Sequence, residues 1–167
     1  MENLYTGILE AREVKTLLAK TSREIGTILL IGFNTGMDLG EVLWLKQEDI
    51  KADEIRLMYR TVIIPQKMGS EVREYIIWRK MKGHDKVWSF KDLGDVGTAY
   101  QSESMRIIGK PISWKAVRRT YVWHGSAAGY PTELLENNTG TDHKYLRQWI
   151  KNNRDYKKLV NESSLYR

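Results

Sequence analysis

The first third of the chain places its apolar residues at the spacing of an α-helix. Between Ala11 and Phe33 they recur three or four positions apart, and the pattern is broken once, at Thr21 and Ser22, a polar pair suited to ending one helix and capping the next. The pattern therefore predicts two helices. Their apolar members are Val14, Leu17, Leu18, Ile25, Ile28, Leu29 and Phe33.

The remainder of the chain predicts more helices around one short strand region. Residues 54–65 (EIRLMYRTVIIP) are β-branched and alternating, end at Pro65, and indicate one or two strands, whereas residues 87–104 are turn-rich and indicate a loop. The predicted fold class is mainly α with a small antiparallel β-sheet (α+β). Further helices are expected over residues 37–45, 70–82 with Ser70 as the cap, 104–108, 114–129 with Ser113 as the cap, 132–138 and 144–153.

Composition limits the classes of protein that are available. With 167 residues, 41% of them hydrophobic, the chain can bury one sizeable core, and we expect a single domain over residues 1–160 with a flexible C-terminal tail over 161–167. The longest apolar run, residues 25–33, is too short to cross a membrane, and the acidic N-terminus does not resemble an export signal. Without cysteine, a reducing cytoplasmic setting is expected.

Histidine placement argues against a metal site. His84, His124 and His143 share no short spacing, so the sequence predicts neither a metal nor a cofactor.

Charge is distributed unevenly along the chain. Residues 1–100 hold 15 basic and 15 acidic side chains, whereas residues 101–167 hold 12 basic and 6 acidic ones, so the net charge of +6 lies entirely in the last segment. A localised basic surface is expected for a protein that contacts the phosphates of nucleic acid, although it is equally typical of a solvated face.

Two segments carry a recognisable spacing. Residues 34–50 (NTGMDLGEVLWLKQEDI) and residues 112–150, which contain KAVRRT, resemble in order and spacing the catalytic domain of tyrosine recombinases, the phage integrase family, and the resemblance spans Ile8 to Ile150. The first family motif, Thr-Gly-x-Arg-x-x-Glu, is matched by Thr35, Gly36 and Glu41, but Asp38 stands where the arginine is expected.

Other motif positions of the family also depart from its pattern. Arg118, Arg119 and Thr120 match the second motif, with Lys115 in place of its usual histidine. The strand region offers Arg56 and Arg60 but no lysine, and Thr141 follows Gly140 where the family has a histidine. The nucleophile register falls at residues 148–150, and the nearest hydroxyls are those of Tyr145 and Tyr156.

Asp38 carries the functional interpretation. Strand cleavage needs cationic donors on the phosphate as negative charge builds up, and losing one such donor costs about 3 to 4 kcal/mol of barrier. The resemblance therefore implies a recombinase-like domain that no longer cuts DNA. Two further roles suit Asp38: an N-cap for the helix after Gly36, also expected if the resemblance is chance, and an ion pair with Arg118 or Arg119 that would silence the phosphate pocket.

Three functions follow from these patterns. The first is a non-catalytic DNA-binding protein, a transcriptional repressor or regulator of phage or mobile-element origin, whose partner is double-stranded DNA. The second is an active, divergent recombinase that uses Tyr145 or Tyr156 as nucleophile and an arginine such as Arg60 in place of the lost one. The third is a protein-interaction module without DNA binding. A homo-oligomer through the C-terminal segment is also expected, but no membrane partner. The predicted DNA-binding residues are Arg118, Arg119, Lys115, Lys110, Arg60, Lys144 and Arg147.

Overall fold

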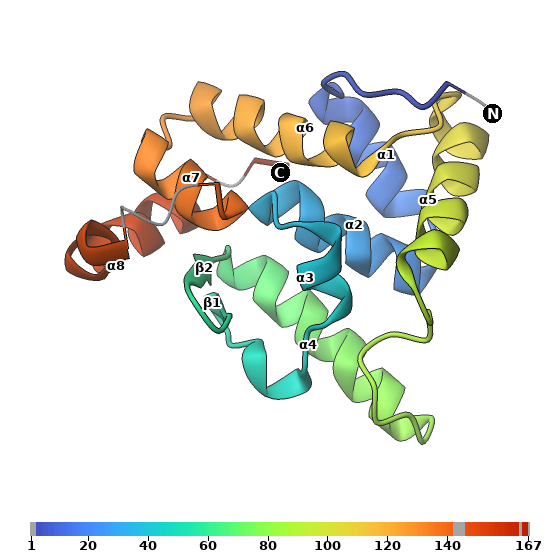
Figure 1. Cartoon of the computed structure of the whole chain (residues 1–167), viewed down its shortest axis with the longest axis horizontal. Coiled ribbons are helices and arrows are strands. Elements are labelled where there is room, and N and C mark those ends of the chain that lie inside the picture. Colours follow the sequence, from blue (N-terminus) through green and yellow to red (C-terminus); the bar gives the residue numbers. More distant parts are fainter. Residues whose placement is uncertain (1–2, 142–145, 164, 167) are drawn as a thin grey trace.

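The computed structural model describes residues 3–141, 146–163, 165 and 166, with the backbone alone for residues 146–153. In this part of the chain the protein is mainly helical and has one two-stranded antiparallel sheet (Figure 1), which confirms the predicted α+β class. In chain order the elements are α1 (Ala11–Lys20), α2 (Arg23–Thr35), α3 (Leu39–Leu43), the short 3₁₀ helix η1 (Gln47–Asp49), β1 (Glu54–Arg56), β2 (Thr61–Ile63), α4 (Gln66–Met81), α5 (Leu93–Ile108), α6 (Trp114–Ala127), α7 (Thr132–Thr139) and α8 (Leu146–Glu162).

Helix α2 is the central element of the core. Its sequence, REIGTILLIGFNT, is apolar around most of its circumference, which is typical of a helix buried on several sides. It packs against α1, α4 and α6, and Figure 1 shows α6 on one side of it and α4 on the other. Ile28, Leu29 and Ile31 are fully buried, and each such side chain stabilises the fold by about 2 kcal/mol relative to an exposed position.

A side chain from α7 makes hydrogen bonds to the backbone of strand β2. Strand β1 pairs antiparallel with β2, with Ile55 opposite Val62. The Asn138 carboxamide accepts a hydrogen bond from the Ile63 amide and donates one to the Ile63 carbonyl, both at 3.1 Å. The asparagine thus satisfies the backbone of β2 as a third strand would. Around this contact lies a second apolar cluster, formed by Ile63, Tyr121, Tyr130, Leu134, Leu135, Tyr156 and Val160.

Several predicted boundaries are confirmed. Helix α1 ends at Lys20 and α2 begins at Arg23, so the polar pair at Thr21 and Ser22 does separate two helices. Ser113 caps α6, because its hydroxyl accepts a hydrogen bond from the Ala116 amide at 3.1 Å.

The predicted start of α4 is wrong. Helix α4 begins at Gln66, directly after Pro65, so Ser70 lies inside the helix and does not cap it. A Cβ on Gly69 would lie 2.1 Å from the carbonyl oxygen of Ala52. The glycine therefore lets α4 approach the chain at Ala52, and the helix continues through it.

Helix α5 is longer than predicted. It begins at Leu93, within the residues expected to form a loop, and runs to Ile108. The carboxylate of Asp92 caps it by accepting from the Asp95 amide at 2.8 Å. Val96 and Tyr100, one turn apart, are buried on its inner face. Burial of this face outweighs the low helix propensity of the glycines near its start.

The end of the chain folds back onto the domain. Helix α8 continues to Glu162, so the domain boundary expected at residue 160 falls inside a helix. The Tyr166 ring lies against Phe33 and His124, at centroid distances of 6.2 and 5.7 Å. The mobility predicted for residues 161–167 stays a prediction, but Tyr166 is in packed contact. Among the described residues no helix is long and apolar enough to cross a membrane.

Candidate functional site

The turn after α2 is built around Gly36 and Asp38. Gly36 ends α2 in the left-handed conformation, with φ of 66°, which a residue without a Cβ adopts at no steric cost. Asp38 then caps α3: its carboxylate accepts from the Gly40 amide at 3.1 Å, and the Glu41 carboxylate accepts from the Asp38 amide at 3.2 Å. The capping role predicted for Asp38 is confirmed, and the reciprocal arrangement is a capping box.

Close packing brings α6 against this turn. A Cβ on Gly32 would lie 2.5 Å from the Trp114 ring, so only a glycine allows α6 to approach α2 here. The Trp114 indole N–H donates to the Met37 carbonyl at 2.8 Å. These contacts fix the first turn of α6 beside residues 36–38, and they carry Arg118, one turn further along, to the same place.

Arg118 is held by backbone carbonyls at the ends of two helices. Its Nε donates to the Gly36 carbonyl at 2.9 Å, and its Nη2 donates to the Thr139 carbonyl at 2.6 Å. These carbonyls close α2 and α7, where the helix dipole favours a cation. Nη1 lies 3.8 Å from Asp38 Oδ1, so the predicted ion pair with Arg118 is present as a long contact. Arg118 remains partly accessible, with 30% of its side chain exposed.

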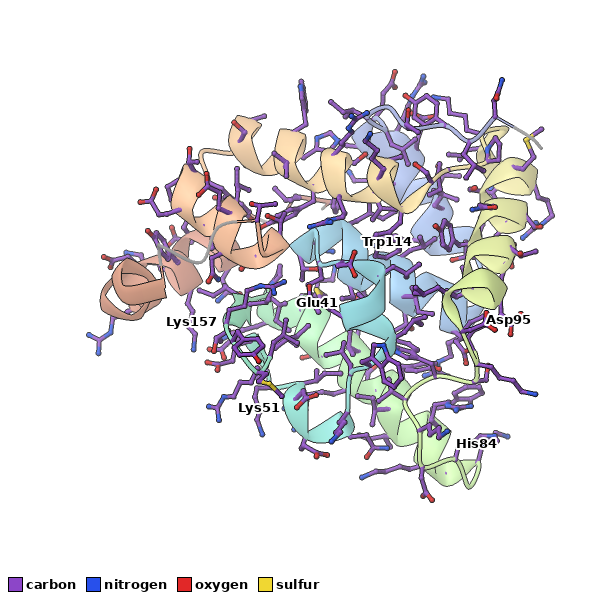
Figure 2. The ribbon with its side chains drawn as sticks, in the orientation of Figure 1. Glu41, Lys51, His84, Asp95, Trp114 and Lys157 are labelled. Atoms are coloured by element: carbon purple, nitrogen blue, oxygen red, sulfur yellow. The ribbon has the colours of Figure 1, made fainter. Side chains whose placement is uncertain are left out.

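Arg60 is directed into the protein. Its guanidinium makes two hydrogen bonds to the Glu41 carboxylate, at 2.5 and 2.7 Å, and a third to the Asn138 carbonyl at 3.1 Å. Only 6% of the Arg60 side chain is exposed. The prediction that Arg60 contacts DNA, or replaces the missing arginine, is not supported by this geometry, because its charge is already paired with a carboxylate. Glu41 is labelled in Figure 2, on α3.

An open groove of about 1040 Å³ contains these residues. Asp38, Glu41, Arg60 and Arg118 lie along it, with Thr139 and Gly140 at the end of α7. Three large, strongly exposed side chains also line it and were not singled out from the sequence: Trp44, Met58 and Tyr59, exposed by 84%, 87% and 73%. Because these three residues look no different in sequence from core residues, only their position in the fold shows that they face solvent.

Three more of the predicted DNA-binding residues, Lys115, Arg119 and Lys110, lie on α6 or just before it and differ in their ion pairs. Lys115 and Arg119 are exposed on α6, one turn apart, and Arg119 donates to the Thr6 carbonyl at 2.9 Å. Lys110 lies 2.7 Å from Glu13 and 4.8 Å from the centre of the Tyr5 ring. Burial raises the pKa of Glu13, but the hydrogen bond and charge of Lys110, with a backbone hydrogen bond, lower it by a larger total amount. The pKa of Glu13 is therefore below its usual value. The positive charge of Lys110 is therefore partly balanced by the Glu13 carboxylate. Lys115 and Arg119, in contrast, are not in an ion pair with a described carboxylate.

The C-terminal positions of the site are only partly described. Lys144 and Tyr145 lie outside the described residues, and so does His143. Arg147 lies on α8, but its side chain is also outside the described part of the structure. The Thr141 hydroxyl is 3.1 Å from that of Thr139.

Tyr156, the second predicted nucleophile, is buried in the cluster under α7. Its hydroxyl donates to Glu133 Oε1 at 3.0 Å. A nucleophile has to approach the phosphate in line, which a buried hydroxyl held by a carboxylate cannot do without local opening.

No protein-family model matches the sequence, and a search of curated proteins found no match. The resemblance to tyrosine recombinases therefore rests on the order and spacing of the motif residues and remains a hypothesis.

Proposed function

We propose that the protein binds double-stranded DNA without cutting it, as a transcriptional repressor or regulator of phage or mobile-element origin built on a tyrosine-recombinase-like domain. The observation that supports DNA binding most directly is the exposed side of α6. Lys115 and Arg119 project from it one turn apart, and the surrounding residues 104–132 include no aspartate or glutamate. A helix face with this charge can lie against a phosphate backbone.

The same face suits contacts with phosphates better than contacts with base edges. Lysine and arginine on a helix surface satisfy phosphate oxygens without regard to sequence. Val122 and Trp123, exposed by 39% and 54%, continue the surface of α6 toward its C-terminus. They offer apolar contact to sugars and bases at the edge of the phosphate contacts.

The proposal that the protein does not cleave DNA rests on the groove. Asp38 places a carboxylate where cleavage would need a cation, and two of the three nitrogens of Arg118 already donate to carbonyls. A scissile phosphate there would meet one negative charge and a guanidinium that is largely committed.

A salt titration on duplex DNA tests the binding proposal. Fluorescence anisotropy with a labelled random-sequence duplex should show affinity that falls as salt rises. Changing Lys115 and Arg119 together to alanine should weaken binding and reduce the slope of log K against log salt by about 2, since each phosphate contact contributes roughly 0.9.

The matched control is a pair of exposed cations on α4, across α2 from α6 (Figure 1). Changing Lys67 and Arg73 together to alanine removes the same number of charges but should leave the slope unchanged. If both double variants lower the affinity equally, binding depends on net charge and not on α6. If the protein does not bind duplex DNA even at low salt, the proposal is wrong and a protein-interaction function is favoured.

The rival enzymatic function has its own test. A duplex with a nick beside the cleavage point releases its leaving strand and traps a covalent phosphotyrosyl intermediate. We expect no trapped species under conditions where the duplex is bound. A covalent complex that disappears in Tyr156→Phe or Tyr145→Phe would establish an active recombinase instead.

A further inference from the structure

A second groove lies between the end of α3 and the start of α5. Its volume is about 970 Å³. Its lining comes from the end of α3 and the residues that follow it (43–48), from the connection between α4 and α5, and from the first turn of α5, with Lys80 contributed by α4. Trp44, Leu45 and Lys46 line this groove and also the groove that holds Asp38. Figure 1 shows α6 along the top of the molecule and the α4–α5 connection at the bottom, so this surface is well away from the proposed DNA-binding face.

The floor of this groove is held in place by hydrogen bonds from several elements. The Trp88 indole donates to the Val42 carbonyl at 2.7 Å, and its ring stacks on Tyr75 at 5.4 Å between centroids. The Arg79 guanidinium donates to the Lys86 carbonyl at 3.0 and 3.2 Å. The Gln47 side-chain amide donates to the backbone carbonyl of Asp85 at 3.1 Å. A surface fixed in this way loses little conformational entropy when it binds a partner.

The groove presents large apolar side chains to solvent. In its lining Trp44 is 84% exposed, Leu93 in the first turn of α5 is 52% exposed, and Phe90 is half-buried. Tryptophan is the residue type most enriched among those that dominate binding energy at protein interfaces. Trp44, Phe90 and Leu93 together give this groove an exposed apolar lining, and a contiguous apolar patch of this kind is typical of an interaction surface.

The rim of the groove carries an excess of unpaired lysines. The lysines of the lining are exposed, and within the described residues none lies within 4.0 Å of a carboxylate: Lys46, Lys80, Lys86 and Lys91. Three acidic residues also line the groove, Glu48, Asp85 and Asp92, and the Asp92 carboxylate accepts the capping hydrogen bond of α5, so the lining carries four lysines and three carboxylates. The surrounding segment 79–91 holds five basic residues and one acidic residue.

We propose that this groove binds an acidic, amphipathic peptide segment of another protein. Its apolar side chains would pack between Trp44 and Leu93, and its carboxylates would face the four lysines. This combination matches recognition of an amphipathic segment in an apolar groove. Nucleic acid fits less well, because a phosphate backbone carries no aliphatic side chains to pack on the apolar floor between Trp44 and Leu93. The inference does not depend on DNA binding, since α6 would remain accessible with this groove occupied.

Selection from a displayed library of random 12-residue peptides tests the proposal, with the whole 167-residue chain as bait. We expect the enriched peptides to combine aspartate or glutamate with two or more large apolar residues. In fluorescence anisotropy with the best labelled peptide, Trp44→Ala and Leu93→Ser should each weaken binding by about tenfold or more. Thermal unfolding and circular dichroism confirm that these exposed substitutions leave the fold intact.

Two controls distinguish this groove from neighbouring surfaces. The double change of Met58 and Tyr59 to alanine removes exposed apolar side chains from the other groove only, and Trp123→Ala removes an exposed tryptophan from α6. Neither should change the affinity for the peptide. If either weakens binding as much as Leu93→Ser, or if no peptide is enriched, the proposed site is wrong.

A charge exchange tests the chemistry of the partner. Changing Lys86 and Lys91 to glutamate should abolish binding of the acidic peptide and allow a matched peptide with lysine at its acidic positions to bind. Equal binding of both peptides to both proteins would show that charge plays no part and would overturn the proposal. It would also be overturned if a single-stranded oligonucleotide displaced the peptide while Trp44→Ala weakened binding of that oligonucleotide, since the surface would then bind nucleic acid.

Discussion

Arg60 and Glu41 form a two-point ion pair, at 2.5 and 2.7 Å, that joins the hairpin to α3 across 19 residues of sequence. The Arg60 side chain is 6% exposed and that of Glu41 is 30% exposed. Gly140 lies directly against the pair, because a Cβ there would be 2.8 Å from the Arg60 guanidinium carbon. Both residues of the pair line the groove that holds Asp38, next to the end of α7.

Breaking this pair should destabilise the protein strongly. Glu41→Ala leaves a buried guanidinium without its carboxylate, and we expect the free energy of unfolding to fall by about 3 kcal/mol. Urea denaturation measures this change. The double variant Glu41→Leu with Arg60→Leu should lose less free energy of unfolding than the sum of the losses in the single variants Glu41→Leu and Arg60→Leu, since neither charge is then left without its partner. Additive losses would contradict a direct coupling.

Asp38 should contribute to stability through its capping hydrogen bond and not through its charge. Asp38→Ala removes the acceptor for the Gly40 amide and should cost about 1 kcal/mol. Asp38→Asn keeps a capping oxygen and should cost only a few tenths of that amount, because asparagine caps as well as aspartate. Equal losses in the two variants, measured by urea denaturation, would show that the ion pair with Arg118 is the larger contribution.

Asn138 should be among the most sensitive polar residues. Besides its two bonds to Ile63, its amide donates to the Tyr121 hydroxyl at 2.9 Å. The Asn138 side-chain oxygen also accepts from the Asn137 side-chain amide at 3.3 Å, so Asn138→Ala leaves four buried groups without this partner and should cost about 3 kcal/mol or more. Tyr121→Phe removes one of these bonds with its hydroxyl and should cost about 1 kcal/mol. The order of the two losses, measured by thermal unfolding, tests whether the asparagine holds β2 in place.

Acid should weaken the contact between α8 and the hairpin. Burial raises the pKa of Glu54, but the hydrogen bonds that its carboxylate accepts from Lys157, at 2.7 Å, and from Arg56, with the charges of these residues, lower it by a larger total amount. The pKa of Glu54 is therefore below its usual value of 4.5. A carboxyl group with a lowered pKa stabilises the fold above about pH 4.5, and this contribution is lost as the pH falls through the folded pKa.

Lys157→Met tests this pH dependence. The variant should be less stable than the unmodified protein at pH 7, and the difference should shrink as the pH falls below about 4.5. Urea midpoints recorded between pH 3 and pH 7 measure the change. Lys158→Met, an exposed neighbour on α8, should run parallel to the unmodified protein. A constant difference for Lys157→Met across the range would show that the lysine acts through packing alone.

The elements that sequence predicts well are those whose burial pattern is local. The two helices on either side of Thr21 and Ser22 follow from apolar spacing within each helix. The cap at Ser113 and the capping role of Asp38 follow from residue type and position, since both depend on amides two or three residues away.

The elements that sequence predicts poorly depend on contacts far along the chain. Gly69 is tolerated in α4 because the helix packs on the backbone at Ala52, which no local pattern reveals. Arg60 looks like an available cation in the sequence, but its partners Glu41 and Asn138 are 19 and 78 residues away. The asparagine that closes the hairpin is likewise invisible to periodicity.

The N-terminal segment is tied to α6 along its length, although it belongs to no helix. The Ser113 amide donates to the Tyr5 carbonyl at 2.9 Å, the Leu9 amide donates to the Thr120 hydroxyl at 3.0 Å, and the Leu9 carbonyl contacts the His124 ring at 2.8 Å. These contacts recur along one side of α6, so the segment cannot lift away from the helix one bond at a time. The Leu9 amide hydrogen should accordingly exchange with solvent as slowly as those of the central helices, and shortening this segment would expose the inner edge of α6 to water.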